Sequence, residues 1–332
     1  MNTQPDIFLE CRERTQRVLA ALKSKVQNHL GDDFNTLVGD HTCVYVTGSM
    51  GRLEMGTNSD LDAYTVGPER EGENTSSLER AVELANAEVG LPSLDGGGKY
   101  LKAVRASHLL DLLGSPEDDS EGVLTKRMLL VLESRVLLGP SAYDHLVGQV
   151  IDAYWQNAEL HPNDYQPFVL VNDIIRYWRI VLLNHESKLR KVEAKDVGLS
   201  DEELLARRRY SSPKLRFPRC LSCFSALTYL LHLAPSDRAH ISKDHVREMI
   251  RLSPLERLER LPKCPLVDEL RALYGEYLVR NDRGEQELLD QLEHDQQEQQ
   301  LMSKSGRDFT KKMFELVQKL GAGRALHRHM LV

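Results

Sequence analysis

The sequence has no long hydrophobic run and no secretory leader pattern. No window of its 332 residues approaches the roughly 18 uninterrupted apolar residues that a membrane-spanning helix needs. The opening residues, MNTQPDIFLECRERTQR, lack the basic-then-apolar order of a secretory signal. We therefore expect a cytoplasmic protein that neither spans nor binds a membrane.

Cysteine is scarce, and its number is odd. The chain has five cysteines, which argues for reduced thiols rather than a disulfide framework. Cys220 and Cys223 form a CxxC pair, but no second CxxC accompanies it, and only His232 and His240 follow closely. Buried thiols on a helix are therefore favoured over a zinc site.

An excess of positive charge is also missing. Lys and Arg number 43 against 50 Asp and Glu, which gives a net charge of -7. Bulk electrostatics therefore do not draw the molecule to nucleic acid, and any polyanion needs a local patch. The chain also shows no internal repeat.

One segment, RRRYSSPKLRFPR at 207–219, offers such a patch. It contains no acidic residue, and its cations are Arg207, Arg208, Arg209, Lys214, Arg216 and Arg219. Two interpretations stay open. The segment is either a solvated basic loop, or a surface on which Lys214 and Arg216 help to hold the triphosphate tail of an NTP or a polyanionic acceptor such as RNA or a second nucleotide.

Hydrophobic periodicity and turn residues predict mixed helices and strands in the first 140 residues. The expected strands are TCVYVTG at 42–48, LDAYTVG at 61–67 and one within 96–107. The expected helices are 6–30, which stops at Gly31, 74–90, and the apolar stretch 121–140, which ends at Gly139-Pro140.

From about residue 140 onward the pattern is helical only. The apolar stretches SAYDHLVGQVIDAYWQ and LRFPRCLSCFSALTYLLHLA both read as helices, and the Gln- and acid-rich tract at 284–306 reads as a solvated helix. We therefore predict an α/β (α+β) domain with a mixed sheet at residues 1–140. An all-helical domain for nucleotide or acceptor binding is expected at 141–332.

Three polar residues share one face of the long apolar helix PFVLVNDIIRYWRIVLLNHESKLRK. They are Asn172, Arg176 and Arg179, at positions i, i+4 and i+7. Asp173 is a possible local partner for Arg176, whereas a buried Arg179 would need another anion. Two interpretations stay open: a structural network at a domain interface, or contact of residues such as Arg176 with a nucleotide.

The stretch TGSMGRLEMGTNSDLDAYTV at 47–66 carries the clearest chemical signal. A strand that runs into Gly48-Ser49 leaves backbone N–H groups free at a turn of little bulk, which a phosphate can approach. Asp60 and Asp62, two residues apart on a strand, point to the same face, where their charges repel unless they share a cation. Two hard carboxylates beside a phosphate cradle indicate Mg²⁺-assisted phosphoryl transfer.

The residues around Gly48, Ser49, Asp60 and Asp62 extend the pattern. They are Gly51, Arg52, Glu54 and Ser59. A Gly-Ser turn followed by Arg and Glu, and then by Ser-Asp-Leu-Asp, resembles the signature of the polymerase-β-like nucleotidyltransferase superfamily. It is most similar to the branch that contains the PII-protein uridylyltransferases. The resemblance spans about residues 40–140, because the stretches 88–113, 118–119 and 124–139 are also similar in order and spacing.

This resemblance implies a role for each motif residue. Gly48 and Ser49 would hold the β- and γ-phosphates of a nucleoside triphosphate, and Asp60 and Asp62 would ligate Mg²⁺ or Mn²⁺. Arg52 would contact the phosphates or anchor the loop, and Glu54 would brace it. Many members add a third carboxylate from a later strand. Asp95 is the best placed candidate here, and Glu133 is the alternative.

The expected reaction is transfer of a nucleoside monophosphate from ATP or another NTP to an acceptor hydroxyl, with release of pyrophosphate. The acceptor is a protein, a tRNA or another nucleotide. The regulatory modules of the uridylyltransferases have no counterpart in the C-terminal half, so their substrate protein does not carry over. The stretch NDIIRYWR, followed by KLR, is similar to the helical tail of stand-alone bacterial nucleotidyltransferases, some of which act in stress response or phage defence. The alternative is a nucleotide-binding regulatory module with little or no turnover, because the third carboxylate is not obvious.

Overall fold

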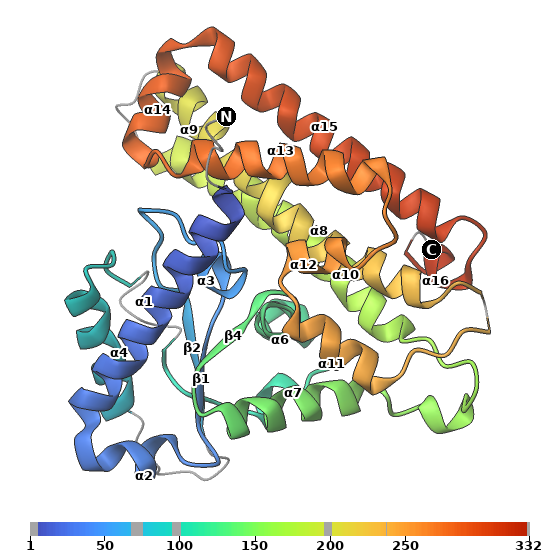
Figure 1. Cartoon of the computed structure of the whole chain (residues 1–332). Helices are drawn as coiled ribbons and strands as arrows, with labels where there is room; N and C mark the ends of the chain where they lie inside the picture. Colours follow the sequence, from blue (N-terminus) through green and yellow to red (C-terminus); the bar gives the residue numbers. More distant parts are fainter. Residues whose placement is uncertain (1–5, 68–75, 95–100, 196–200, 237, 331–332) are drawn as a thin grey trace. The chain divides into compact units, whose positions relative to one another are not determined.

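The computed structural model describes residues 6–67, 76–94, 101–195, 201–236 and 238–330 (Figure 1). The chain forms two compact units. The first contains Met1–Gln156 together with Lys243–Ser253, and the second contains Asn157–Ser242 and Pro254–Val332. The sequence placed the division near residue 140, whereas in the structure the helix that follows residue 140 belongs to the first unit.

The first unit is built around a small mixed sheet. Its strands are β1 (Cys43–Val46), β2 (Ala63–Gly67), β3 (Val104–Arg105) and β4 (Arg135–Leu138). The strand order is β3-β2-β1-β4, in which β1 is antiparallel to β2 and β4, and β2 is parallel to β3. The helices of the unit are α1 (Ile7–Leu30), α2 (Phe34–Val38), α3 (Gly48–Gly51), α4 (Ser76–Val89), α5 (Glu117–Ser120), α6 (Val123–Glu133), α7 (Pro140–Tyr154) and α11 (Lys243–Arg251).

The two faces of the sheet are covered differently. Val44 and Val46 of β1 join a buried apolar cluster with residues of α1 and α4, which lie side by side in Figure 1. On alternate positions, Tyr45 stacks on Tyr64 with ring centroids 5.5 Å apart and also meets Tyr143 of α7. The period of two in β1 therefore separates an aliphatic core from an aromatic one.

Most predicted elements of the first unit are confirmed, and one is wrong. α1 ends at Leu30, directly before Gly31, and β1 and β2 form as expected. The predicted helix 121–140 instead ends at Glu133, and Arg135–Leu138 becomes β4. Gly139 explains the end of this strand, because it adopts φ +64 and a Cβ there would lie 2.1 Å from the carbonyl oxygen of Thr42.

The regular structure of the second unit is helical, and none of its described residues lies in a strand. Its helices are α8 (Phe168–Lys195), α9 (Asp201–Lys214), the π-helix η5 (Leu215–Arg219), α10 (Cys220–Leu233), α12 (Pro254–Glu259), α13 (Pro265–Asn281), α14 (Glu285–His294), α15 (Gln296–Gly321) and α16 (Ala325–Arg328). The predicted class, a mixed α/β region followed by a helical one, therefore holds.

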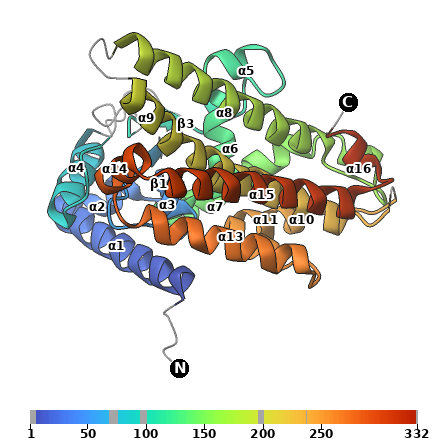
Figure 2. The same cartoon turned by 90° about the horizontal axis from the view of Figure 1, so that it is seen from above.

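An aromatic cluster forms part of the core of the second unit. Phe217 of η5 stacks on Tyr277 with centroids 4.7 Å apart and lies 5.0 Å from Phe309. Tyr274 completes the cluster. These rings join η5 to α13 and α15, which run side by side in Figure 2.

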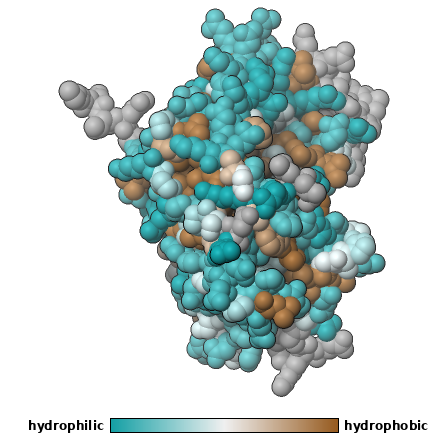
Figure 3. All heavy atoms as spheres, turned by 90° about the vertical axis from the view of Figure 1, so that its right-hand side faces the viewer, coloured by the Kyte–Doolittle hydropathy of each residue, from teal (hydrophilic) through white to brown (hydrophobic). Residues whose placement is uncertain are grey.

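The surface fits the absence of long apolar runs in the sequence. The face drawn in Figure 3 is mainly hydrophilic, with small, separate apolar patches. Among the described helices, none combines the length and apolarity that a bilayer crossing requires. All five cysteines are free thiols, and Cys220 and Cys223 lie buried on α10, as the sequence predicted.

Candidate functional site

The glycine turn that follows β1 brings two of the predicted site residues together. Gly48 adopts φ +63, and a Cβ at this position would lie only 2.5 Å from Oδ2 of Asp62. The backbone N–H of Thr47 donates to the carbonyl oxygen of Asp62 at 2.8 Å, which continues the pairing of β1 with β2. The carboxylate of Asp62 therefore lies against the turn, and the backbone there requires glycine.

A second glycine is required for a different reason. A Cβ on Gly51 would lie 1.8 Å from the carbonyl oxygen of Glu133, so the turn packs directly on the backbone where α6 ends. The N–H groups of Gly51 and Arg52 donate to the carbonyl oxygens of Thr47 and Gly48 at 3.1 and 3.0 Å. The turn is thus a single compact helical turn, α3, pressed between Asp62 and the start of β4.

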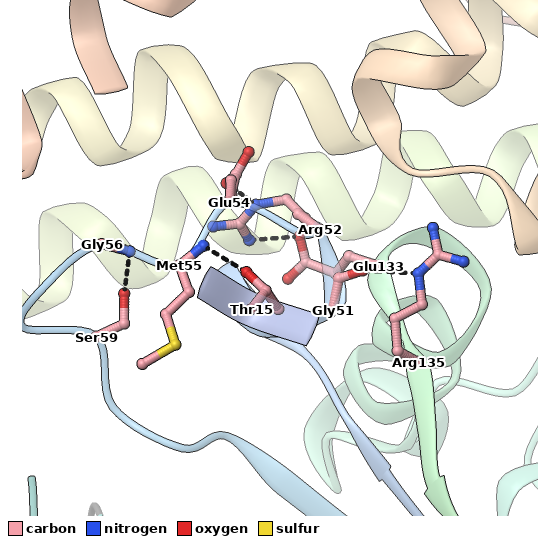
Figure 4. Close-up of polar contacts among 9 residues, drawn as sticks. All are labelled: Thr15, Gly51, Arg52, Glu54, Met55, Gly56, Ser59, Glu133 and Arg135. Atoms are coloured by element: carbon pink, nitrogen blue, oxygen red, sulfur yellow. Dashed lines mark hydrogen bonds and ion pairs between the residues drawn. The ribbon is translucent and has the colours of Figure 1, made fainter. Parts of the chain in front are cut away.

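Arg52 lies in a buried ion-pair network (Figure 4). Its Nη1 donates to Oε2 of Glu133 at 2.8 Å, and its Nε donates to Glu54. The side chains of Arg52 and Glu133 are 8% and 1% exposed, so solvent contributes little and the two charges compensate each other. Arg52 therefore anchors the loop, and the carboxylate of Glu133, the alternative third carboxylate, is bonded to an arginine.

Helix α1 fixes the next part of the loop, as Figure 4 also shows. The buried hydroxyl of Thr15 accepts the N–H of Met55 at 3.1 Å and donates to the carbonyl oxygen of Cys11 at 2.7 Å. Arg14 donates to the carbonyl oxygen of Met55 at 3.1 Å. The N–H of Gly56 then donates to Oγ of Ser59 at 2.9 Å. The connection between the glycine turn and the aspartates is therefore held at several points.

Asp60 and Asp62 lie in the segment directly before β2, which begins at Ala63, rather than within the strand as predicted. Both are partly exposed, although Leu61 between them is buried. The carboxylate of Asp62 lies beside a glycine that has no side chain, and Asp60 is two residues away; carboxylate oxygens are ligands that suit a hard divalent cation such as Mg²⁺ or Mn²⁺. The described residues contain no group of three or more His, Cys, Asp or Glu side chains placed to hold a metal ion, and Asp95 lies outside the described residues.

The tyrosines and the thiol on the other face of the sheet do not offer acid–base chemistry near neutral pH. Burial raises the pKa of the Cys43 thiol to about 12 and the pKa of Tyr45 well above its ordinary value. The hydroxyls of Ser134 and Tyr143 lie 2.7 Å apart and share a hydrogen bond. These groups stay protonated and support the sheet.

Arg176 belongs to the second unit, and its predicted local partner is confirmed. Its Nη1 lies 2.8 Å from Oδ1 of Asp173, which is buried. Arg179 is exposed, so the expectation that it needs a buried anionic partner was wrong. The face that carries Asn172, Arg176 and Arg179 is largely in contact with solvent.

The basic segment 207–219 is not a loop. It runs through the end of α9 and all of η5 into α10. Pro213 and Pro218 lie inside the helical run, and each removes one backbone donor, which favours the wider π-type hydrogen bonding of η5. Arg216 packs against α15, where it donates to the carbonyl oxygen of Ser303 at 3.4 Å and a Cβ on Gly306 would lie 2.9 Å from its Cδ.

The other cations of the segment face a different environment. Nζ of Lys214 lies 4.5 Å from the ring centre of Tyr210, whose hydroxyl donates to Oε2 of Glu285 at 3.1 Å. Helix α14, which belongs to the acid-rich tract, packs beside α9. Arg207, Arg208 and Lys214 are exposed. The positive charge of the segment is thus partly balanced within the second unit.

The sequence did not identify Thr15, Arg14 or Arg135 as part of the site. Thr15 sits four residues after Cys11 on the buried face of α1, which predicts burial but no partner. Arg135 donates to the carbonyl oxygen of Gly51 at 3.3 Å, a bond that depends on β4 being a strand. No protein-family model matches the chain, and neither does any curated protein. The motif residues and their geometry therefore carry the functional argument.

Proposed function

We propose that the protein is a metal-dependent nucleotidyltransferase that transfers a nucleoside monophosphate from an NTP to an acceptor hydroxyl and releases pyrophosphate. The contact between Gly48 and the carboxylate of Asp62 carries this proposal. It brings the low-bulk turn against one of the two motif aspartates.

In this proposal the turn at Gly48 and Ser49 receives the triphosphate, since the backbone there carries little side-chain bulk. Asp60 and Asp62 would hold Mg²⁺ or Mn²⁺. When bound, the cation supplies charge neutralisation at the triphosphate and orientation for in-line displacement. Arg52 keeps the turn in place through Glu54 and Glu133, so that the protein contributes mainly alignment and a preformed electrostatic site.

The acceptor is proposed to be a protein, a tRNA or another nucleotide, and ATP is the first NTP to test. Arg207, Arg208 and Lys214, which are exposed on α9, are the cations placed to attract a polyanionic acceptor. Arg176 and Arg216 are weaker candidates for nucleotide contact, because Asp173 and α15 already engage them. The five free thiols fit a reducing cytoplasm, and a role in bacterial stress response or phage defence is part of the proposal.

A second candidate is a nucleotide-binding regulatory module without turnover. The engagement of Glu133 by Arg52 favours it, because one of the two candidates for a third metal carboxylate is thereby removed. Such a module would bind an NTP at the same turn and release no pyrophosphate.

One experiment separates the two candidates. The purified chain is incubated with each labelled NTP and Mg²⁺ or Mn²⁺, with and without total cellular RNA and protein, and pyrophosphate and labelled products are measured. Calorimetry of NTP binding is run in parallel, with the divalent metal and with excess chelator. Pyrophosphate release and a labelled product support transfer. Metal-dependent binding without pyrophosphate supports the regulatory module, and no NTP binding under any condition contradicts both.

A further inference from the structure

Arg135, the first residue of β4, bridges two backbone carbonyl groups that are far apart in the sequence. Its Nε donates to the carbonyl oxygen of Gly51 at 3.3 Å, and its Nη1 donates to the carbonyl oxygen of Arg251 at 2.5 Å. Gly51 is the last residue of the glycine turn α3, and Arg251 is the last residue of α11. Figure 4 shows the side chain of Arg135 beside Gly51. One guanidinium therefore connects the glycine turn to the C-terminal end of α11.

Helix α11 has an unusual place in the chain. It packs in the first unit, although the segments before and after it, Asn157–Ser242 and Pro254–Val332, form the second. Val246, Met249 and Ile250 are buried, and Lys243 pairs with Asp152 of α7 at 2.6 Å. Both ends of α11 are thus covalently continuous with the second unit, while its side chains pack in the first.

The glycine turn has little freedom to absorb a displacement. Gly51 already touches the backbone of Glu133, and Gly48 touches the carboxylate of Asp62. A shift of the carbonyl group of Gly51 therefore moves the turn as a body or breaks these contacts, because close-packed backbone does not deform gradually.

We propose that Arg135 is a positioning residue through which α11 sets the order of the glycine turn. Any change in the second unit that pulls on α11 then reaches Gly51 through one side chain that can donate to two carbonyl groups at once. Lysine cannot replace it, since a single ammonium on a flexible chain lacks the planar fork. The proposal rests on the proposed function only in assigning the triphosphate to this turn.

A double-mutant cycle read by amide hydrogen exchange tests the coupling directly and needs no activity. Val246→Ala loosens the core of α11 more than one helical turn away from Arg251. In the wild-type background we expect this change to raise exchange in residues 48–54 about tenfold, the effect of weakening one hydrogen bond to a charged group. In the Arg135→Met background the same change should leave exchange in 48–54 unaltered. Equal effects of Val246→Ala in both backgrounds would overturn the proposal.

Two further variants keep the test decisive. Arg135→Lys preserves the charge and is used if Arg135→Met does not fold; it should also lose the coupling, and retention of the full effect contradicts a bridging role. Arg251→Ala is the matched control. Only the backbone of Arg251 accepts the bond, and its side chain is exposed and meets Asp144 at a distance of 3.7 Å. Exchange in 48–54 should therefore match that of the wild type, and a large increase would place the coupling in the side chain of Arg251.

Kinetics separate positioning from general stability. If the protein transfers nucleotides, Arg135→Met should raise KM for the NTP about tenfold while kcat changes less, because the turn that receives the triphosphate is misplaced and the aspartates are not. An equal loss in kcat with unchanged KM would contradict this. If no transfer or NTP binding is found, the proposed function fails, and the exchange cycle still decides whether Arg135 couples α11 to the turn.

Discussion

The glycine turn of the first unit and the basic segment of the second carry the two strongest signals in the sequence, and they behave differently. At residues 48–62 several signature residues have a geometric reason for their identity. Gly48 and Gly51 admit Asp62 and Glu133 at distances that no Cβ allows, and Arg52 is buried between two glutamates. Glu133, the partner of both Gly51 and Arg52, is distant from them in the sequence.

At residues 207–219 the residue types have weaker constraints. Arg207, Arg208 and Lys214 lie exposed on a helix, Arg216 packs against α15, and α14 adds acidic side chains nearby. The three exposed cations could be replaced without a steric conflict. Fixed spacing of glycine and acid therefore predicts geometry, whereas a run of like charge predicts only that some of the charges meet solvent or an opposite charge.

Removal of Asp60 and Asp62 should lower activity far more than any change in the basic segment. Asp60→Ala with Asp62→Ala should abolish nucleotide transfer and leave thermal unfolding unchanged or slightly improved, because two carboxylates that repel each other are lost together with the metal site. The control is Asp32→Ala with Asp33→Ala, an adjacent exposed pair, which should keep full activity. Pyrophosphate release gives the readout, and wild-type turnover by the Asp60, Asp62 variant would refute the site.

Arg52→Met should have the largest effect on stability. It leaves the charges of Glu54 and Glu133 without their arginine, and breaking a buried pair in this way costs about 3 to 5 kcal/mol. Adding Glu133→Gln should recover part of the loss. Arg80→Met is the matched control, because Arg80 is exposed and pairs with Glu83 on the same helix, so about 0.5 kcal/mol or less is expected. Urea unfolding measures all three, and equal losses for Arg52 and Arg80 would contradict the buried network.

The sequence predicted the parts of the site that depend on local chemistry. The strands around the turn and the proximity of Gly48 to the aspartate segment follow from spacing, turn residues and alternation. It could not predict the bond between Thr15 and Met55, because a threonine on a buried helix face has no sequence signal for its partner. The end of α6 was also missed, since the run VLESRVLLG is apolar enough for either state and only pairing with β1 makes its second half a strand.

The conformation of the basic segment 207–219 also depends on packing that the sequence does not reveal. Its charge was read correctly, and the stretch from Leu215 onward was predicted as a helix, but a loop stayed open for the segment as a whole, because two prolines normally argue against a helix. Packing of Phe217 with Tyr274, Tyr277 and Phe309 outweighs the backbone bonds that the prolines remove. Tertiary burial, which a local window does not contain, decided the structure of this segment.

Gly51→Ala should destabilise the first unit by about 1 to 3 kcal/mol, since the new methyl group must displace the backbone at Glu133. Gly148→Ala is the control. Gly148 lies within α7 with no atom near its hypothetical Cβ, so alanine should be neutral or should stabilise by up to about 1 kcal/mol. Thermal unfolding distinguishes them, and a stable Gly51→Ala protein with wild-type hydrogen exchange would show that the close approach is not required.

Alkaline pH should destabilise the buried parts of both units. The pKa of Cys43 and of Cys220 is about 12 in the folded chain, raised by burial from an ordinary 9.0. Because the folded-state pKa is raised, the contribution to stability is complete below pH 9 and is lost as the unfolded thiol ionises between pH 9 and 12. The loss is at most about 1.4 kcal/mol per pH unit for each thiol. Urea unfolding from pH 8 to 11 measures the slope, which should flatten when Cys43→Ala and Cys220→Ala are combined. An unchanged slope in that variant would assign the effect to other groups.

The smallest effect is expected in the basic segment, where it separates a binding surface from ordinary solvated charge. Arg207→Ala with Lys214→Ala removes exposed cations, so stability should change by no more than about 0.5 kcal/mol. If these residues hold a polyanionic acceptor, acceptor KM should rise while NTP affinity stays constant, and the dependence of acceptor binding on salt should fall by about one unit of slope for each cation removed.

Lys311→Ala with Lys319→Ala, two exposed lysines on α15, controls for net charge and should leave acceptor KM unchanged. A parallel fall in NTP affinity would instead indicate that the segment binds the triphosphate. Unchanged kinetics across a salt series would leave Arg207 and Lys214 as solvated charge on α9, because a binding surface on an acidic protein must lose affinity when its cations are removed.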